Sequence, residues 1–451
     1  MSALRPPLQF VLKVASRCNL NCSYCYVYNK GDSTWRSRPS VMPDAVFTAA
    51  VGRIRRYCEA SGQAVAHVVF HGGEPCLVGA SRLRRWCGEL RTGLRGVATP
   101  RFAIQTNGTL VDQEWIDVFR DEEVQVGVSI DGDAALHDAF RVDHLGRGSH
   151  AQVEEGIRRL LAAGLSPQVL SVIPLSGDGL RTYEYFRALD VRRIHFLLPD
   201  YTHDTKGSAV RHGGSTPVAD FLMPVVEKWC LTDWEETDVP LFRQIAELVL
   251  GGSSRSDQFG NGPLGIVFVE ADGDIEGLDV LRVCADGAAA VGLSVLRDDF
   301  EQIAAAGDLH ARAIFEGLQL PAVCGACPER ETCGGGYLPH RFSKAAGFDN
   351  ASIWCADILR LFDRMRSLLA VSVEETASRQ TVLRQRADSE TLPGRVSLDF
   401  DLSVPEVRGL LRNSAPSQPG DGCFPADSSI SSPREESPER REGRSLTRRE
   451  P

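Results

Sequence analysis

Hydrophobic stretches of strand length alternate with amphipathic stretches of helix length through the first half of the chain. The predicted strands are Leu8–Val14, Ala64–Phe70, Arg101–Gln105, Val124–Ile130, Pro167–Ile173 and Arg193–Leu198. Helical spacing of apolar residues predicts helices over Pro43–Ala60, Ser81–Arg95, Asp112–Arg120, His150–Ala163 and Leu180–Leu189. Strands separated by helices in this way form a parallel sheet with the helices on the outside.

Polar motifs follow the predicted strands at the point where each strand ends. They include a cysteine-rich loop from Cys18, the stretch Gly72–Pro75, and Asn107 and Asp131. In a β/α barrel the active site lies at the carboxyl ends of the strands, so these motifs converge on one mouth. Six strand–helix units, rather than eight, predict a partial, open (β/α)6 TIM barrel. Its open side suits a large substrate such as a peptide.

The second half of the chain has a different pattern. After helical stretches at Val218–Leu231 and Leu241–Leu250, the glycine-rich segment Gly251–Gly265 predicts a domain boundary. We expect residues 1–250 to form the barrel and residues 251–375 to form a second domain, closed by a helix over Ile353–Val371. Residues 376–451 read as a linker and a Pro/Ser/Arg/Glu-rich tail, which we expect to be disordered.

Composition narrows the functional class. The chain has 451 residues, 43% of them hydrophobic, and a net charge of −10, with no basic stripe in its body. This argues against a nucleic-acid partner. No signal peptide is apparent, and no run of about 18 apolar residues exists that could cross a membrane, so we expect a cytoplasmic protein. Thirteen cysteines in such a chain favour metal binding or redox work over disulfides.

Three of the cysteines form a tight group in the loop after the first predicted strand. Cys18, Cys22 and Cys25, called here the loop cysteines, lie in the sequence C-N-L-N-C-S-Y-C-Y. A cubane iron–sulfur cluster takes four thiolates, and this loop offers three, so one iron keeps an open position, as a catalytic metal does. A zinc knuckle or a chance grouping is the alternative.

This loop, together with Gly72-Gly73-Glu74-Pro75, resembles the radical S-adenosylmethionine (SAM) superfamily. The resemblance implies that the open iron of a [4Fe–4S] cluster binds SAM, and that one electron from the cluster cleaves it to a 5′-deoxyadenosyl radical. It assigns catalysis to the loop cysteines and Glu74, the last as acceptor for the SAM ammonium. The SAM-binding residues that it implies are Tyr24, Gly72, Gly73, Glu74, Gln105, Asn107, Ser129, Asp131 and Arg141.

Within that set, Arg141 is the expected clamp for the SAM carboxylate, because its planar guanidinium suits that group. A surface salt bridge is the alternative. Arg141 belongs to an H-D-x-x-R stretch that starts at His137 and is followed by Gly146-x-Gly148-Ser149. This pattern resembles the SPASM-type branch of the superfamily.

A second cysteine group lies near the end of the predicted second domain. Its members, called here the pocket cysteines, are Cys324, Cys327, Cys333 and Cys355. The spacing resembles a SPASM domain and implies one auxiliary [4Fe–4S] cluster; a zinc site is the alternative. A second auxiliary cluster is expected to be missing, because Tyr337 stands where the full pattern has a cysteine and only Cys284 is available upstream. Cys284 and the remaining single cysteines, Cys58, Cys76, Cys87 and Cys230, are expected to be buried.

The stretches Cys333–Phe342, Gly347–Asn350 and Trp354–Asp357 resemble the FxsB-type peptide maturases and their cyclophane-forming relatives. Glu276–Val280 and Leu197–Asp200 agree with that branch. The resemblance implies a ribosomally made precursor peptide as substrate, hydrogen abstraction from a side-chain β-carbon, and a carbon–carbon bond to an aromatic ring. A flavodoxin or ferredoxin is the expected reductant. Because the chain starts almost directly at the first strand, we expect another surface or a separate protein to recognise the leader.

Two alternatives are kept. The same machinery could form thioethers or oxidise a sulfatase cysteine or serine, although both reactions are expected with a fuller set of auxiliary ligands. A non-catalytic iron–sulfur electron carrier is the alternative of another class. Glu74, Ser129 and Arg141 argue against it, since a carrier needs no SAM pocket.

Overall fold

Six parallel strands follow one another in the computed structural model, as the hydrophobic pattern predicted. They are β1 (Gln9–Ala15), β2 (Val65–Gly72), β3 (Thr99–Thr106), β4 (Gln125–Ser129), β5 (Gln168–Val172) and β6 (Ile194–Leu197). Each strand pairs with the next, so that the order in space repeats the order in sequence. In register, Phe10 of β1 lies opposite Val68 of β2, which lies opposite Phe102 of β3. All three side chains are buried, as expected for a sheet covered on its outer face.

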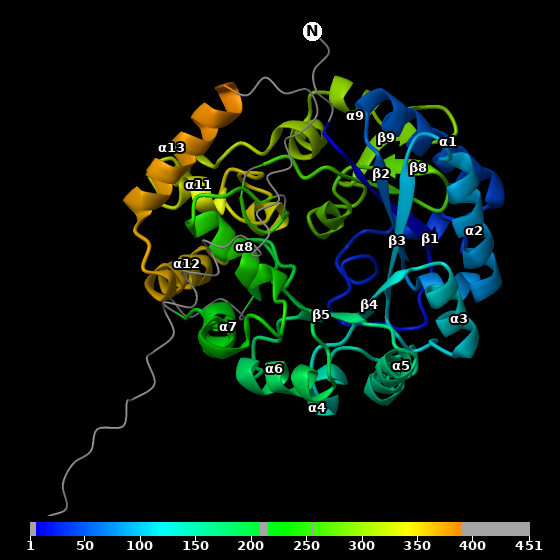
Figure 1. Ribbon diagram of the computed structural model, residues 1–451, viewed down its shortest axis with the longest axis horizontal. Helices are drawn as coiled ribbons and strands as arrows, with labels where there is room; N and C mark the ends of the chain where they lie inside the picture. The colour runs from blue at the N-terminus through cyan, green and yellow to red at the C-terminus, as the bar shows by residue number, and fades with distance from the viewer. Residues whose placement is uncertain (1–5, 208–214, 255, 261, 390–451) are drawn as a thin grey trace, which may run out of the picture. The chain divides into compact units, whose positions relative to one another are not determined.

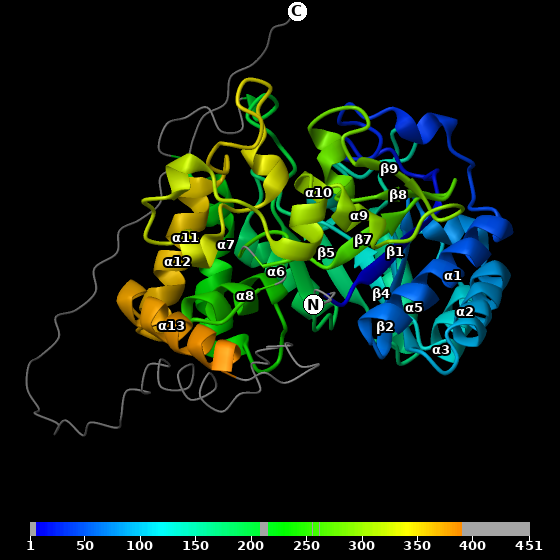
Figure 2. The same cartoon turned by 90° about the horizontal axis from the view of Figure 1, so that it is seen from above.

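Helices connect the strands and cover the outer face of the sheet (Figures 1 and 2). Their bounds are α1 (Asp44–Ser61), α2 (Ala80–Gly93), α3 (Gln113–Asp121), α4 (Ala134–His137), α5 (His150–Ala162), α6 (Gly179–Ala188), α7 (Pro217–Lys228) and α8 (Pro240–Val249). Phe47 of α1 stacks on Trp86 of α2, with ring centroids 4.6 Å apart. The predicted partial (β/α)6 barrel is thereby confirmed.

Local sequence explains where several elements begin and end. Strand β1 is buried on both faces from its second residue onward, in keeping with its nearly continuous apolar sequence. Helix α1 ends at Gly62, whose φ of 70° is easily reached only by glycine. Helix α3 begins after Asp112, whose carboxylate accepts a hydrogen bond from the backbone N–H of Trp115 at 3.1 Å.

The sheet continues beyond the barrel strands. Strand β7 (Ile266–Val269) pairs in parallel with β1, and β8 (Asp274–Glu276) and β9 (Ala290–Ser294) extend it in antiparallel fashion. The boundary proposed between residues 250 and 251 is therefore crossed by one continuous sheet. Pairing between β1 and β7 depends on backbone hydrogen bonds across more than half the chain, which no local pattern reveals.

Short helices and turns make up much of the remainder. They include η1 (Thr34–Ser37), η2 (Pro75–Val78), η4 (Trp229–Asp233), η5 (Asp279–Val283), α9 (Gln302–Ala305), α10 (Leu309–Ala311), η6 (Arg312–Glu316), η7 (Ala322–Cys324), α11 (Arg330–Cys333) and η8 (Leu338–Arg341). The longer α12 (Cys355–Leu369) packs against α7 and α8, and α13 (Val373–Ser389) follows it.

The structure describes residues 6–207, 215–254, 256–260 and 262–389, with only the backbone of residues 382–389. All of these residues belong to one compact unit. Helix α13 occupies the start of the segment 376–451 that was assigned to a linker and tail, so that part is helical rather than a linker. The tail predicted to be disordered, from Ser414 onward, lies outside the described residues.

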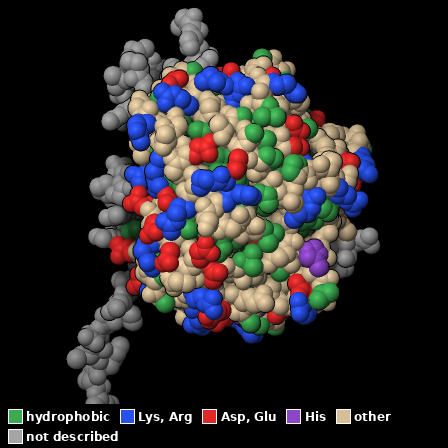
Figure 3. Space-filling model, turned by 90° about the vertical axis from the view of Figure 1, so that its right-hand side faces the viewer, with side chains coloured by type: hydrophobic (Ala, Val, Ile, Leu, Met, Phe, Trp, Pro, Cys, Tyr) green, Lys and Arg blue, Asp and Glu red, His purple; other side chains and the backbone are tan. Residues whose placement is uncertain are grey.

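The face that carries α1, α2 and α3 shows acidic and basic side chains interspersed (Figure 3). Ion pairs join these helices, as between Arg85 and Asp44 at 2.9 Å and between Arg84 and Asp121 at 2.7 Å. Among the described helices, none is both long and apolar enough to span a bilayer.

Candidate active site

The loop cysteines follow β1 and lie against a second segment of the barrel mouth. The N–H of Asn21 donates to the carbonyl of Val142 at 2.7 Å, and that of Ser23 donates to the carbonyl of Phe140 at 3.0 Å. All three cysteines are half-buried. The H-D-x-x-R stretch thus holds the loop in place through its backbone.

The environment of these thiols disfavours free thiolates. Burial raises the pKa of the Cys18 thiol to about 12, with smaller contributions from the nearby Glu74, Cys22 and Cys25. Burial also raises the pKa of Cys22 and of Cys25, although Arg141 opposes the rise at both. Such thiols lose their protons readily only beside a positively charged metal centre. The three loop cysteines are therefore suited to bind an iron–sulfur cluster.

Gly72 and Gly73, at the end of β2, pack against the start of the same loop. A Cβ on Gly72 would lie 2.1 Å from the carbonyl oxygen of Ala15, and one on Gly73 would lie 2.0 Å from the Tyr28 hydroxyl and 2.4 Å from the carbonyl oxygen of Arg17. The N–H of Gly73 donates to Ala15 at 2.7 Å. The contact that requires these glycines is therefore the approach of two chain segments.

Glu74 is fully buried beneath the mouth. Its Oε1 accepts hydrogen bonds from the N–H of Cys76 at 2.9 Å and from the Thr106 hydroxyl at 2.7 Å, and its Oε2 accepts one from the N–H of Asn107 at 2.7 Å. Burial raises the pKa of this carboxyl, while these donors lower it. The Cys76 thiol also hydrogen-bonds to this carboxyl and lowers its pKa, so protein donors hold the carboxylate in one orientation.

Asp131, after β4, is the centre of a buried network. It accepts hydrogen bonds from the Tyr24 hydroxyl at 2.5 Å, from Arg141 Nε at 2.8 Å and Nη2 at 3.2 Å, and from the N–H of Val172 at 3.0 Å. The Arg141 guanidinium lies 5.3 Å from the Tyr24 ring centroid. Burial alone would lower the pKa of Arg141, but Asp131 raises it above its usual value. Arg141 is thus a buried, permanently charged group at the mouth and not a surface salt bridge.

The rest of the H-D-x-x-R…G-x-G-S stretch supports this network. His137 Nδ1 lies 3.4 Å from the backbone N of Asp131, and its Nε2 lies 2.9 Å from the hydroxyl of Ser149, which donates to the carbonyl of Arg141 at 2.8 Å. A Cβ on Gly148 would lie 2.2 Å from the Asp138 carboxyl carbon. These residues position Asp131 and Arg141, a role that the sequence pattern did not reveal.

The other two predicted SAM contacts of the neighbouring strands lie side by side. Gln105 of β3 donates from Nε2 to the hydroxyl of Ser129 of β4 at 2.9 Å. A Cβ on Gly127 would meet Gln105 Oε1 at 2.3 Å, so this glycine leaves room for the amide. Both side chains point toward the inner face of the sheet near the mouth.

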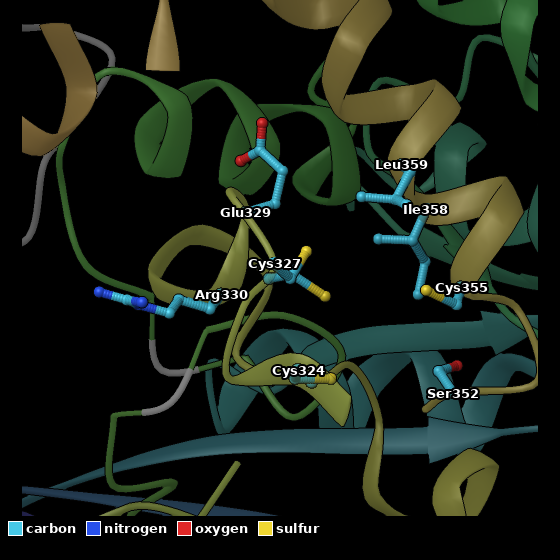
Figure 4. A pocket seen from close by; sticks show the side chains of 10 residues that line it. Cys324, Cys327, Glu329, Arg330, Ser352, Cys355, Ile358 and Leu359 are labelled. Carbon is cyan, nitrogen blue, oxygen red and sulfur yellow. The ribbon is translucent and has the colours of Figure 1, made fainter. Parts of the chain in front are cut away.

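The pocket cysteines line one cavity, together with Glu329, Arg330, Gly335, Ser352, Ile358 and Leu359. Cys324 comes from η7, Cys333 from the end of α11 and Cys355 from the start of α12, and the labelled thiols face a common space (Figure 4). Burial raises the pKa of Cys333 to about 12. Within the described residues, no three His, Cys, Asp or Glu side chains are arranged to hold a single metal ion.

Cys284 lies in a separate apolar cluster, as expected for a buried cysteine. The cluster contains Leu278, Val280, Leu281, Val283, Cys284, Ala313 and Leu338, with Tyr26, Tyr337, Phe342 and Phe348 packed against it. The other single cysteines of the described residues, Cys58, Cys76, Cys87 and Cys230, are also buried, as predicted.

Comparison with known proteins identifies a family domain in the first half of the chain. A profile of the radical SAM superfamily matches residues 12–179, which contain the loop cysteines and every predicted SAM contact. Residues 12–179 therefore form a radical SAM domain. The chain is accordingly an enzyme of the oxidoreductase type, whose cofactors are a [4Fe–4S] cluster and SAM.

The known proteins that are similar in sequence to this radical SAM enzyme include sulfatase-maturating enzymes. The cysteine-type anaerobic sulfatase-maturating enzyme of Clostridium perfringens (strain 13) is 24% identical over 365 residues, which cover 79% of this chain and 96% of that protein. The serine-type enzyme of Bacteroides thetaiotaomicron is 28% identical over 252 residues, 52% of this chain and 59% of that protein.

Solved structures share the fold. The structure of anSMEcpe with bound AdoMet matches with a TM-score of 0.68 at 22% identity, over 83% of this chain and 100% of that chain. Streptococcus suis SuiB bound to the precursor peptide SuiA matches with a TM-score of 0.52 at 15% identity, over 77% of this chain and 75% of that chain.

Two charged residues at the mouth of the radical SAM domain were not singled out as site residues from the sequence. Asp279, at the start of η5, accepts a hydrogen bond from the Tyr26 hydroxyl at 2.7 Å and lies 2.9 Å from Lys13 Nζ. Asp200, after β6, has a pKa raised to about 7, first by burial. Both belong to the stretches Glu276–Val280 and Leu197–Asp200, whose resemblance to the FxsB-type branch was the available signal.

Proposed function

We propose that this radical SAM enzyme modifies a ribosomally made precursor peptide and joins an aromatic side chain to the β-carbon of another residue, giving a cyclophane. The observation that carries the proposal is that aromatic side chains lie beside the cysteine-rich loop at the mouth. Tyr26 directly follows Cys25, and it packs with Tyr337, Phe342 and Phe348 against the apolar cluster that contains Cys284. Such a surface suits an aromatic side chain of a substrate.

The cluster and SAM together supply a 5′-deoxyadenosyl radical, which takes a hydrogen atom from the substrate. The chain's own residues orient the reactants. Glu74, whose Oε2 accepts from the N–H of Asn107, is the proposed partner of the SAM ammonium, and Arg141, aligned by Asp131, is the proposed partner of its carboxylate. Gln105 and Ser129 line the mouth between them.

Formation of the carbon–carbon bond requires that the substrate lose a second hydrogen, as one proton and one electron. Asp279 and Asp200 are the candidate proton acceptors. Burial would raise the pKa of Asp279, but Lys13, His71 and the Tyr26 hydroxyl together lower it below its usual value, so this carboxylate is ionised. Asp200, with a pKa of about 7, suits general-base work near neutrality. The pocket cysteines, as ligands of an auxiliary [4Fe–4S] cluster, provide the candidate electron acceptor.

A peptide substrate is also supported by the comparisons. Both similar enzymes described above are named for sulfatase maturation, and SuiB was solved with a precursor peptide. A flavodoxin or ferredoxin is the proposed electron donor to the SAM-binding cluster.

The second candidate function is oxidation of a cysteine or serine in a sulfatase-type protein, which the names of the similar enzymes favour. We rank it second because the site of Cys284 is filled with apolar side chains, whereas that reaction is expected with the fuller set of auxiliary ligands.

The test is anaerobic reconstitution with iron and sulfide, followed by SAM, dithionite and a candidate peptide. The expected result is 5′-deoxyadenosine together with a peptide that has lost two hydrogen atoms and whose fragment ions stop at the crosslinked residues. An aldehyde that reacts with a hydrazide would instead support the sulfatase-type reaction. SAM cleavage with neither peptide product, across aromatic-containing and cysteine-containing substrates, would contradict both.

A further inference from the structure

Asn107 directly follows β3, and its backbone position is fixed independently of its side chain. The backbone N–H donates to Glu74 Oε2 at 2.7 Å, and the residue is buried. A substitution of the side chain therefore leaves this anchor in place. The question is what the side-chain amide does.

The orientation of that amide follows from its neighbours. Asn107 Oδ1 accepts hydrogen bonds from the backbone N–H of Thr109 at 3.0 Å and from the Thr109 hydroxyl at 2.7 Å. A backbone N–H can only donate, so the atom facing it must be the oxygen. The nitrogen is thereby turned to the opposite side, where Nδ2 lies 3.7 Å from Cys18 Sγ and 2.8 Å from Asn19 Oδ1.

Asn19 completes a ring with Asn107 and Thr109. Since Asn19 Oδ1 accepts from Asn107, its Nδ2 faces the Thr109 hydroxyl, at 2.8 Å. That hydroxyl has its own proton directed at Asn107 Oδ1 and can accept. Every donor in the ring thus meets an acceptor, and only this arrangement satisfies all three side chains together.

The ring directs one N–H at the sulfur of Cys18. The backbone N–H of Leu20 also lies 3.4 Å from the same sulfur. In iron–sulfur proteins, hydrogen bonds to the ligand sulfurs help to set the reduction potential. Donors stabilise the more negative, reduced cluster, so they raise that potential.

We propose that Asn107, oriented by Asn19 and Thr109, donates a hydrogen bond to the Cys18 thiolate and raises the reduction potential of the SAM-binding cluster. This inference rests on Cys18 as a cluster ligand and not on the peptide reaction. Among the described residues, the side-chain amide already uses both hydrogens and both oxygen lone pairs. Its role is therefore to tune the cluster rather than to contact SAM.

The test compares midpoint potentials from anaerobic titrations monitored by electron paramagnetic resonance, following the signal that changes when SAM is added. Asn107→Leu removes the donor and keeps the volume; its potential should be more negative than that of the wild type, with iron content unchanged. Thr109→Val removes one of the two groups that orient the amide, so it should shift the potential in the same direction by a smaller amount.

Asn29→Leu is the matched control, because Asn29 lies in the same loop and donates from Nδ2 to the carbonyl of Cys22 at 2.8 Å rather than to a sulfur. It should leave the potential unchanged. A wild-type potential in both Asn107→Leu and Thr109→Val, or an equal shift in Asn29→Leu, would overturn the inference while leaving the enzyme assignment intact. A wild-type protein without a SAM-responsive signal would overturn the ligand role of Cys18 as well.

Discussion

The buried ion pair between Glu329 and Arg366 should stabilise the folded structure around the pocket cysteines. Arg366 Nε and Nη2 donate to the two Glu329 oxygens at 2.6 and 2.8 Å, and each side chain is 8% exposed. Arg366 also donates to the Thr376 hydroxyl at 2.6 Å. The pair joins α12 to the loop between Cys327 and Cys333, so it braces two sides of the cavity.

Replacement of Glu329 by Gln leaves the Arg366 charge buried without its partner, which costs about 3–5 kcal/mol in comparable buried pairs. We expect the metal-free protein to unfold at a clearly lower urea concentration, and the reconstituted protein to lose iron faster to a chelator. Arg366→Met should act similarly. The double variant should be less destabilised than the sum of the two, because neither charge is then left alone.

Glu331→Gln is the control on the same loop. Its pair with Arg330 is long, at 3.4 Å, and exposed, at 36% and 50%, so its loss should cost less than about 1 kcal/mol. Urea unfolding followed by circular dichroism, under anaerobic reducing conditions, measures the wild type and all four variants. The reasoning is refuted if Glu329→Gln is no more destabilised than Glu331→Gln, or if the double variant shows simple additivity.

Three further predictions concern the two cysteine sites and the mouth. Alanine at the loop cysteines should abolish SAM cleavage and remove about four irons, whereas alanine at the pocket cysteines should remove another four or so; iron analysis that finds zinc in the second site would contradict the cluster there. Gly73→Ala forces a Cβ to within 2.4 Å of the Arg17 carbonyl oxygen, so overpacking of about 1–3 kcal/mol should reduce SAM cleavage by about tenfold or more, while Gly88→Ala, with nothing within 4 Å, should keep normal cleavage. Because the pKa of Asp200 is raised from 3.8 to about 7, its protonated form favours the folded state, and stability should fall as the pH rises from about 4 to 7, by at most about 1.4 kcal/mol per pH unit. Asp200→Asn should lack this loss, so its melting temperature should exceed that of the wild type at pH 8 but not at pH 4; a variant that is less stable at pH 8 would show that the carboxylate is not disfavoured by burial.

The comparisons and the structure bear differently on the two candidate functions. Similarity to sulfatase-maturating enzymes extends over 365 residues, or 79% of this chain, at 24% identity for one of them. The apolar surroundings of Cys284 and the aromatic side chains beside Tyr26 are local features of this chain. Peptide products, rather than overall similarity, therefore decide between the two reactions.

Much of the barrel could be predicted from the sequence because its determinants are local. Each strand and helix leaves its own periodicity, and parallel strands joined by helices have few alternative arrangements. The loop cysteines are within eight residues of one another, so their shared role is visible in a short motif. The pocket cysteines are more widely spaced, but the tight group of Cys324 and Cys327 marks the site.

Contacts between residues far apart in the chain were decided only by the tertiary structure. Asn107 and Cys18 are 89 residues apart, and Tyr24 and Asp131 are 107 apart, so no pattern in the sequence shows that these side chains meet. The same holds for the pairing of β7 with β1, which carries Asp279 to the mouth. A motif identifies residue types, but the direction of each hydrogen bond depends on which strands the backbone brings together.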